Sequence, residues 1–322
     1  GKGYQLDYNN VGSIIQRKEI GGSGTNQIED FCWNEHQTLR GVKKGDNDHA
    51  DLAHYVYDDA GERVLKTIIT GSLVNTNSQG QTVLSLESPT VYVNPYFIAS
   101  HYEEAVLISK HYYMGDQRIS SALSHLVDSA GFVSGIGYEG GNMSLATDAV
   151  IQDMQATMDC LYDVSVELDW EAMLAQPSLT DGVTLAVYCE DDLDPTICAC
   201  EQSTFVAQVA GNIDCSEIAV MYWYHPDYLG SVEFITDMRG DAYQFFHNTI
   251  WGENLQNQMA FNYRSFSSRF RFNGKEWDEE TGNFYYGARY YDPRISVWLS
   301  VDPWRNKYPD LSPYNFVAGN PL

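Results

Sequence analysis

The sequence has no lysine or arginine between residues 119 and 238, although these 120 residues include twenty aspartates or glutamates. This stretch therefore carries 20 of the 25 net negative charges, and the rest of the 322-residue chain, with 24 acidic and 19 basic residues, is only mildly acidic. Binding to nucleic-acid phosphates needs a cluster of basic residues, whereas the negative charge of this stretch would repel the phosphates. We therefore expect no nucleic acid as a partner, whereas cationic surfaces and metal ions stay compatible with the charge.

Long apolar runs are missing too. No eighteen consecutive residues are apolar, so the sequence predicts no membrane-spanning helix. The chain begins inside a repeated pattern, without a signal peptide, and ends on Asn320-Pro321-Leu322 without a stop-like tail. We therefore expect a piece of a larger protein, with ample hydrophobic material, 43% of residues, for a core.

Common catalytic signatures are also lacking. The sequence contains no Gly-x-Ser-x-Gly elbow, no His-Glu-x-x-His pair and no phosphate-binding Gly-Lys-Ser loop. We expect no cofactor, and no nuclease, deaminase or transferase activity can be assigned. His225 lies in a strand-turn motif and is interpreted as a hydrogen-bonded structural residue rather than a base.

What the chain does have is a C-terminal region rich in aromatic, glycine and aspartate residues. Between residues 274 and 293, Gly and Asp-Pro interrupt the aromatic positions at short intervals, a pattern typical of short strands joined by tight turns. Residues 280–283 (ETGN) predict a turn, because Gly and Asn tolerate positive φ. Residues 284–286 and 290–291 are then expected to be flanking strands with packed rings.

The C-terminal region contains two separated blocks of such residues, namely YHPDYLGS at 224–231, TDMRGD at 236–241 and IWGE at 250–253, and then FNGKEWD at 272–278, ETGNFYYGARYYDP at 280–293 and VWLSVDP at 297–303. The order of these motifs resembles the core segment of the RHS (rearrangement hotspot), or YD-repeat, family. The resemblance implies a mainly β fold of short antiparallel strands and hairpins, wound as a spiralling β-sheet cocoon. Family members use such shells to hold a C-terminal toxin.

The first third of the chain repeats a related pattern more loosely. Residues 4–14 resemble residues 55–64, and residues 31–42 are similar to a degenerate third copy. In each copy, an aromatic pair leads to Asp or Asn, a turn and an apolar strand, as in the Tyr-Asp repeats of the family. Residues 91–96 and 110–119 continue the rhythm. Stacked repeats bury their faces only against neighbours, so a fragment is expected to expose an unfinished edge.

The acidic stretch between these regions does not match the repeat, and we interpret it as a small α+β insertion. Its best helix candidate is residues 143–164, because Ile151, Met154, Met158 and Leu161 recur on one face. Ser144 or Thr147 is the expected cap. A second short helix is expected at 170–176, and strands at 184–189 and 205–209. The methionine stripe indicates packing rather than a cofactor site.

Metal and disulfide sites in the insertion are left open by the sequence. Calcium ligands are conceivable at Glu190, Asp191, Asp192 and Asp194, but these residues lack the glycine and distant glutamate of an EF-hand, which favours a solvated acidic loop. Five of the six cysteines lie in or beside the insertion, namely Cys160, Cys189, Cys198, Cys200 and Cys215, and Cys32 stands apart. Disulfides within the insertion, such as Cys189 or Cys215 with Cys198 or Cys200, would leave one cysteine over. Free buried thiols are an equal alternative.

The family resemblance also implies a candidate for chemistry. Many family members cleave themselves just downstream of the core with an aspartic-type protease, in which two carboxylates activate water. The candidates in this sequence are Asp292 and Asp302, with Arg289 or Arg294 as the orienting group. Both aspartates precede proline, so an Asx-type turn is a sufficient structural reason for them. The family's usual cleavage sequence does not occur after Asn320-Pro321-Leu322, and the Asp302-Pro303 motif lacks its frequent glycine.

These observations predict three regions: YD-like shell strands at 1–125, the acidic insertion at 126–220, and the RHS core at 221–322. We expect a structural, encapsulating segment of a secreted or cell-surface, polymorphic-toxin-like protein. Its expected partners are a C-terminal cargo or toxin of the same polypeptide, the missing N-terminal part of the shell and a secretion apparatus. One alternative is an adhesive or partner-binding module, and another is a self-cleaving core, so the enzyme question stays open.

Overall fold

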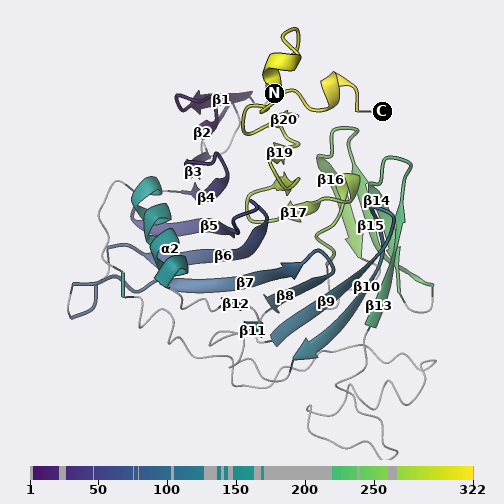
Figure 1. Cartoon of the computed structure of the whole chain (residues 1–322), viewed down its shortest axis with the longest axis horizontal. Helices are drawn as coiled ribbons and strands as arrows, with labels where there is room; N and C mark the ends of the chain where they lie inside the picture. Colours follow the sequence, from purple (N-terminus) through teal and green to yellow (C-terminus); the bar gives the residue numbers. More distant parts are fainter. Residues whose placement is uncertain are drawn as a thin grey trace, which may run out of the picture.

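The computed structural model describes residues 3–21, 27–45, 47–74, 76–78, 80–102, 105–126, 136–138, 141–143, 148–162, 168–169, 220–237, 240–259 and 267–321. Fourteen strands of these residues form one antiparallel sheet, called the shell sheet below (Figure 1). Its strands follow one another in chain order, so that β1 and β16 are its two edges. The strands are β1 (Gly3–Tyr8), β2 (Ile14–Ile20), β3 (Ile28–Trp33), β4 (Leu39–Lys44), β5 (His49–Tyr57), β6 (Arg63–Ser72), β7 (Ser85–Asn94), β8 (Phe97–Tyr102), β9 (Ala105–Met114), β10 (Gln117–Leu126), β13 (Val220–Pro226), β14 (Val232–Thr236), β15 (Ala242–Asn248) and β16 (Asn254–Met259).

One turn explains the repeated sequence pattern. Its first residue uses Oδ1 to accept the backbone N–H groups two and four residues later, at 2.8–3.1 Å, in the copies that begin at Asn9, Asn34, Asp58 and Asp227. The fourth residue has positive φ and is glycine in three of these copies. In the degenerate copy, Gln37 takes this position with φ 62°. The side-chain acceptor and the left-handed residue together define the hairpin, so the expected strand-turn-strand repeats are confirmed.

A smaller sheet, called the core sheet, lies within the bend of the shell sheet (Figure 1). It contains β17 (Glu276–Asp278), β18 (Asn283–Tyr285), β19 (Tyr290–Asp292) and β20 (Val297–Trp298). The predicted turn joins β17 to β18, with Gly282 at φ 69°, whereas Asn283 already belongs to β18. Short 3₁₀ turns lie at Phe272–Gly274 (η2), Arg305–Lys307 (η3) and Val317–Gly319 (η4). The expected mainly antiparallel β fold is thereby confirmed.

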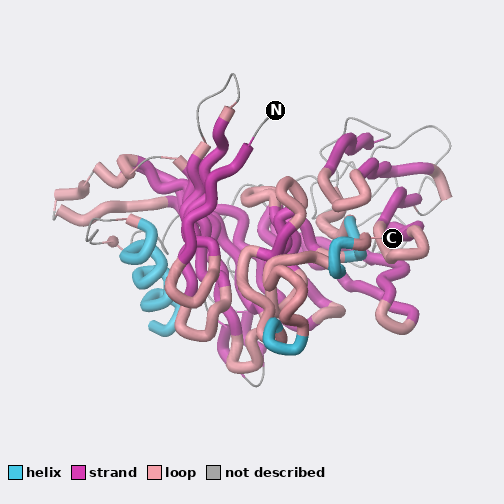
Figure 2. The backbone as a smooth tube through the Cα atoms, turned by 90° about the horizontal axis from the view of Figure 1, so that it is seen from above, coloured by secondary structure: helices cyan, strands magenta, loops and turns pink. Residues whose placement is uncertain are grey.

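Strands β3 to β6 are buried on both faces because their side chains alternate between two hydrophobic clusters. Phe31, Val42 and Ala53 pack with Tyr290 and Leu299 of the core region. Their alternate neighbours pack in a second cluster with helix α2 (Asp148–Leu161), which includes Cys32, Leu52, Leu65, Ile69, Met154 and Met158. Figure 2 shows α2 along one side of the stacked strands. This part of the shell sheet is therefore the middle of three layers.

Helix α2 confirms the predicted helix but is shorter than residues 143–164. Met154, Met158 and Leu161 are buried as expected, and Ile151 is half-buried. The expected caps Ser144 and Thr147 lie outside the described residues, as do the predicted helix at 170–176 and the strands at 184–189 and 205–209. A two-stranded sheet of β11 (Ile136–Tyr138) and β12 (Gly141–Met143) precedes α2. No helix in the described part of the chain is both long and apolar enough to cross a membrane.

Cys32 stands apart from the other cysteines in the sequence but has a disulfide partner in the structure, which corrects its apparent isolation. Cys32 in β3 forms a disulfide with Cys160 in α2, across 128 residues of sequence. The bond therefore links the shell strands to the insertion instead of closing a loop within the insertion. The other four cysteines lie outside the described residues.

Candidate functional site

Opposite charges join the core sheet to the shell sheet. The shell strand β6 supplies two buried cations, and the core sheet supplies the carboxylates. Arg63 binds Asp278 at 2.7 Å and Glu276 at 2.8 Å, while Lys66 binds Asp278 and Glu280, each at 3.0 Å. The Arg63 and Asp278 side chains are both fully buried. A buried pair of this kind costs little only when each charge finds its partners, so the two sheets fit in one register.

Tyrosines complete the surroundings of Arg63. Its guanidinium lies over the ring of Tyr285 at 4.2 Å and over that of Tyr92 at 4.8 Å, and it donates to the hydroxyl groups of Tyr92 and Tyr290 at 2.9 and 3.2 Å. The result is a cation enclosed by aromatic rings and carboxylates. Burial disfavours the charge, but Asp278 and its neighbours outweigh this and raise the pKa of Arg63.

The same surroundings shift the pKa of the Asp278 carboxyl in the opposite direction. Burial would raise the pKa of Asp278, but Arg63 and Lys66 together lower it below the ordinary value of 3.8. A group with a lowered folded-state pKa stabilises the folded state above its unfolded pKa, and this stabilisation is lost as the pH falls through the folded value. The attachment of the core sheet is therefore at full strength at neutral pH.

A second ionic cluster surrounds Asp292. This fully buried carboxylate pairs with Arg17 of β2 and with Arg294, whose Nε lies 2.9 Å from Oδ1. Arg17 also pairs with Glu29 of β3. Asp292 Oδ1 accepts the backbone N–H of Arg294 at 3.0 Å, which confirms the Asx-type turn. Both oxygens of Asp292 thus have structural partners.

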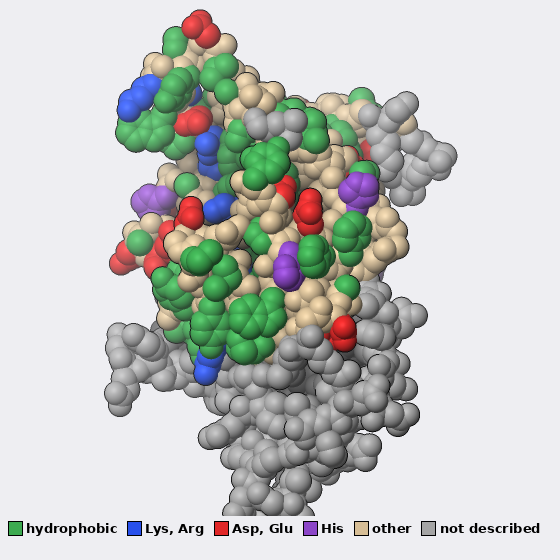
Figure 3. Space-filling model, turned by 90° about the vertical axis from the view of Figure 1, so that its right-hand side faces the viewer, with side chains coloured by type: hydrophobic (Ala, Val, Ile, Leu, Met, Phe, Trp, Pro, Cys, Tyr) green, Lys and Arg blue, Asp and Glu red, His purple; other side chains and the backbone are tan. Residues whose placement is uncertain are grey.

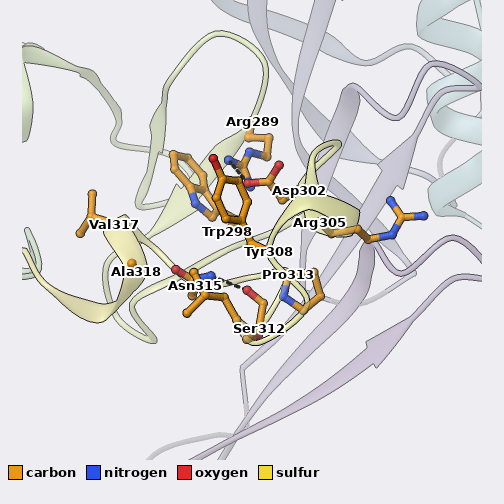
Figure 4. A pocket seen from close by; sticks show the side chains of 11 residues that line it. Arg289, Trp298, Asp302, Arg305, Tyr308, Ser312, Pro313, Asn315, Val317 and Ala318 are labelled. Carbon is orange, nitrogen blue, oxygen red and sulfur yellow. Dashed lines mark hydrogen bonds and ion pairs between the residues drawn. The ribbon is translucent and has the colours of Figure 1, made fainter.

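Asp302 lies in a different environment, at a pocket of about 280 Å³ in the C-terminal segment (Figure 4). Its Oδ2 accepts a hydrogen bond from Arg289 at 3.1 Å, and its Oδ1 accepts the N–H of Trp304 at 2.7 Å. The Arg289 guanidinium lies 4.2 Å above the Trp298 ring. Tyr308 lines the same pocket, while Arg305 points away from the other labelled side chains (Figure 4).

Arg289 has unused hydrogen-bonding capacity in this pocket. Its Nη1 is buried and has no hydrogen-bond partner among the described residues. Burial lowers the pKa of Arg289, although Asp302 opposes this. The pocket therefore combines a carboxylate, a hydrogen-bond donor and aromatic walls.

The predicted site residues thus fall into two groups. Arg294 with Asp292 belongs to the buried junction between the sheets, and Arg289 with Asp302 belongs to the pocket. The calcium candidates Glu190, Asp191, Asp192 and Asp194 lie outside the described residues. Within the residues described, no three His, Cys, Asp or Glu side chains are grouped to hold a metal ion.

His225 has the structural role expected for it. Its Nε2 lies 3.0 Å from Thr236 Oγ1, and its ring stacks on Phe234 with centroids 4.2 Å apart.

The shell-strand cations of the junction were not among the predicted site residues. Arg17, Arg63 and Lys66 occupy strand positions that are buried to 3–4% exposure. The available signal was a basic residue inside an otherwise apolar strand, as in Arg63-Val64-Leu65-Lys66. Such residues are rarely buried without a charged partner.

Comparison with known proteins supports the resemblance to RHS-type proteins over parts of the chain. No family model matches. The tRNA3(Ser)-specific nuclease WapA of Bacillus spizizenii is 32% identical over 123 residues, which is 38% of this chain and 5% of that protein. The toxin subunit YenC2 of Yersinia entomophaga is 35% identical over 82 residues, which is 26% of this chain and 8% of that protein. The matched residues thus cover less than a tenth of the length of either relative.

The fold is similar to that of a much larger solved structure. The crystal structure of TcdB2-TccC3 matches 99% of this chain with a TM-score of 0.53 and 15% sequence identity, over 13% of that chain. A second structure, of TcdB2-TccC3 without its hypervariable C-terminal region, matches with a TM-score of 0.51. The bent antiparallel sheet and its core sheet therefore have the fold of one part of such a protein.

Proposed function

We propose that this chain is a structural segment of an RHS-type shell, which encloses a C-terminal cargo or toxin of the same polypeptide and is secreted or displayed on a cell surface. The observation that carries the proposal is the bend of the shell sheet around the core sheet, with the two joined by buried ion pairs (Figure 1). The likeness to TcdB2-TccC3, a protein described as having a hypervariable C-terminal region, supports a variable cargo.

The junction between the core sheet and the shell sheet suits the wall of a shell because buried ion pairs hold the two sheets together. Arg63 and Asp278 are 215 residues apart in the sequence, so their pairing closes the C-terminal region onto the shell strands. A fully enclosed ion pair tolerates few alternative arrangements. The core sheet is thereby fixed at one position on the concave side.

The test uses the longer natural protein and measures protection of the region after Leu322 from an added protease. We expect slow cleavage of that region in the wild type and fast cleavage in Asp278→Asn, because the variant leaves Arg63 without its main partner. Asp310→Asn, at an exposed position, is the matched control and should behave as the wild type. Equal cleavage of the region inside the wild type and expressed alone would refute enclosure.

Self-cleavage is a second candidate because Asp302 and Arg289 line a pocket in the C-terminal segment. Since Asp292 is enclosed by Arg17 and Arg294, Asp302 is the residue more open to a peptide. Intact-mass analysis with terminal sequencing of the longer protein tests this. If Asp302→Asn abolishes a C-terminus near Leu322 while the protein stays folded, Asp302 takes part. An uncut wild type leaves both aspartates as turn residues.

Adhesion is the third candidate. Trp223, Phe234 and Phe245 are 37–43% exposed on one face of β13–β15. Figure 3 shows hydrophobic and histidine side chains among polar ones on this side of the molecule. Most of the insertion lies outside the described residues. Binding of the folded chain to a glycan array, lost in Trp223→Ser, would favour this function over a purely structural wall.

A further inference from the structure

Three neighbouring strands present one row of unusual residues to helix α2. In the register of the shell sheet, Cys32 of β3 lies opposite Gly41 of β4, and Gly41 lies opposite His54 of β5. Residues that are directly opposite point to the same face of a sheet. The row therefore offers a thiol, an open backbone and an imidazole side by side.

Helix α2 places one side chain against each of two residues in this row, His54 and Gly41. Asp153 Oδ2 lies 3.0 Å from His54 Nε2. One turn later, Thr157 lies over Gly41, where a Cβ would come within 2.6 Å of Thr157 Cγ2. The helix thus runs across the strands at close distance, and its position is fixed at the level of single residues.

At Cys32, the third residue of the row, the contact with α2 is a covalent bond. Cys160, near the end of α2, is bonded to Cys32. Cys32 is 1% exposed, whereas Cys160 is an exposed residue. Just beyond it, Lys43 donates to the Leu161 carbonyl at 3.1 Å. The disulfide therefore joins a buried cysteine of the sheet to an exposed residue of α2, and Cys160 is the half nearer to solvent.

The helix covers a large part of the hydrophobic interior. Leu52, Leu65 and Ile69 pack with Met154 and Met158 in one cluster, and each of the five is at most 2% exposed. Removal of α2 would expose this face of β5 and β6 to water. The opposite face of the same strands packs on the core sheet and does not depend on α2.

We propose that the Cys32–Cys160 disulfide is a reductant-sensitive link, which holds helix α2 on the shell sheet and is opened by a dithiol. A thiolate of the dithiol attacks Cys160 Sγ, the bond to Cys32 breaks, and Cys32 leaves as a thiolate that takes a proton from water. The second thiol of the dithiol then attacks the mixed disulfide and releases Cys160. The dithiol is oxidised to a disulfide, and two protein thiols form.

Opening this bond separates two layers that the structure holds by different means. The first layer is α2, fastened by the disulfide and by the Asp153 contacts to His54 and Arg40, the latter 3.1 Å long. The second layer is the core sheet, fastened by Arg63 and its partners. A reductant acts on the first fastening and leaves the second intact. Helix α2 is therefore released while the shell and core sheet stay joined.

Hydrogen exchange of the folded chain, followed by mass spectrometry with and without dithiothreitol, tests the proposal. We expect reduction to speed amide exchange of residues 148–162 at least about tenfold, and residues 276–292 to keep their protection. Alkylation should label Cys32 only after reduction. Cys32→Ala/Cys160→Ala should exchange like the reduced wild type without any reductant.

The four insertion cysteines need a control, because dithiothreitol acts on them as well. The variant with serine at positions 189, 198, 200 and 215 should keep the full response of α2 to the reductant. Unchanged protection of residues 148–162 in both the reduced wild type and the double alanine variant would overturn the proposal. So would loss of protection in the core sheet at the same rate, because the two layers would then open together.

Discussion

The two arms of the shell sheet use the same antiparallel strands but differ in how their faces are covered. In the N-terminal arm, β3 to β6 are covered by the core sheet on one face and by α2 on the other. In the C-terminal arm, one face of β13 to β15 packs against residues 268–271, through contacts such as Tyr224 to Ser268, while the other exposes Trp223, Phe234 and Phe245. Similar strands are therefore buried to different extents, because later segments of the chain cover two faces of one arm and one face of the other.

The inner face of the N-terminal arm should give the largest effect. Arg63→Met leaves Asp278 and Glu276 buried without their main cation, and we expect the free energy of unfolding to fall by about 3–5 kcal/mol. Urea denaturation measures it. Lys110→Met, at an exposed strand position, is the matched control and should change it by less than about 0.5 kcal/mol. A similar small effect of Arg63→Met would show that the ion pairs contribute little to joining the two sheets.

The outer face of the same arm should respond to a single methyl group. In Gly41→Ala the new Cβ would meet Thr157 Cγ2 at 2.6 Å and the Ala53 carbonyl oxygen at 3.1 Å. We expect the free energy of unfolding to fall by about 1–3 kcal/mol. Adding Thr157→Ser removes Cγ2 but keeps a hydroxyl that can donate to Asp153, so part of the loss should return. No recovery in the double variant would contradict the close packing of α2.

His111 in β9, which lies between the two arms and packs against Phe270, should give a pH-dependent effect. Burial, with a smaller contribution from Arg118, lowers the pKa of His111 to about 2. Because the unfolded chain takes up a proton near pH 6.5 and the folded chain does not, the free energy of unfolding should decrease as pH falls, by about 1 kcal/mol per pH unit below pH 6. Denaturant titrations from pH 6.5 to 4.5 should show a shallower slope in His111→Asn. His36→Asn, at an exposed position, should keep the wild-type slope.

The outer face of the C-terminal arm should give the smallest effect. Phe245 is 42% exposed, so we expect Phe245→Thr to change the free energy of unfolding by less than about 0.5 kcal/mol. Its neighbour Phe246 is 3% exposed, and Phe246→Thr should cost about 3–5 kcal/mol in the same urea titrations. Equal losses would mean that both faces of β15 are covered in the folded protein.

Much of the fold was predictable because its signals are local. An Asn or Asp that accepts two backbone N–H groups, followed by a residue with positive φ, defines a hairpin within five residues, and this pattern is readable at Asn9 and Asp58. The apolar spacing of Met154 and Met158 likewise predicted α2. The Asx-type turns at Asp292 and Asp302 follow from the same short-range rule.

The candidate site was only partly predictable. The sequence pointed to Asp292, Asp302, Arg289 and Arg294, but it did not show that they belong to two environments. Asp292 is buried by Arg17, which lies 275 residues earlier in the chain, and Asp302 lies at an open pocket. Proximity to proline looks the same in both cases. The difference depends on which strand of the shell sheet faces each carboxylate.

The hairpins, the helix and the division into a strongly acidic region and a mildly acidic remainder follow from local sequence, because turn chemistry, periodicity and charge act over a few residues. The pairing of Cys32 with Cys160 and of Arg63 with Asp278, across 128 and 215 residues, follows from the three-dimensional fold alone. Such partners are chosen by the register of fourteen strands and by the bend that brings the C-terminal region back onto them. A cysteine or an arginine in a strand carries no local mark of the residue that will lie opposite it.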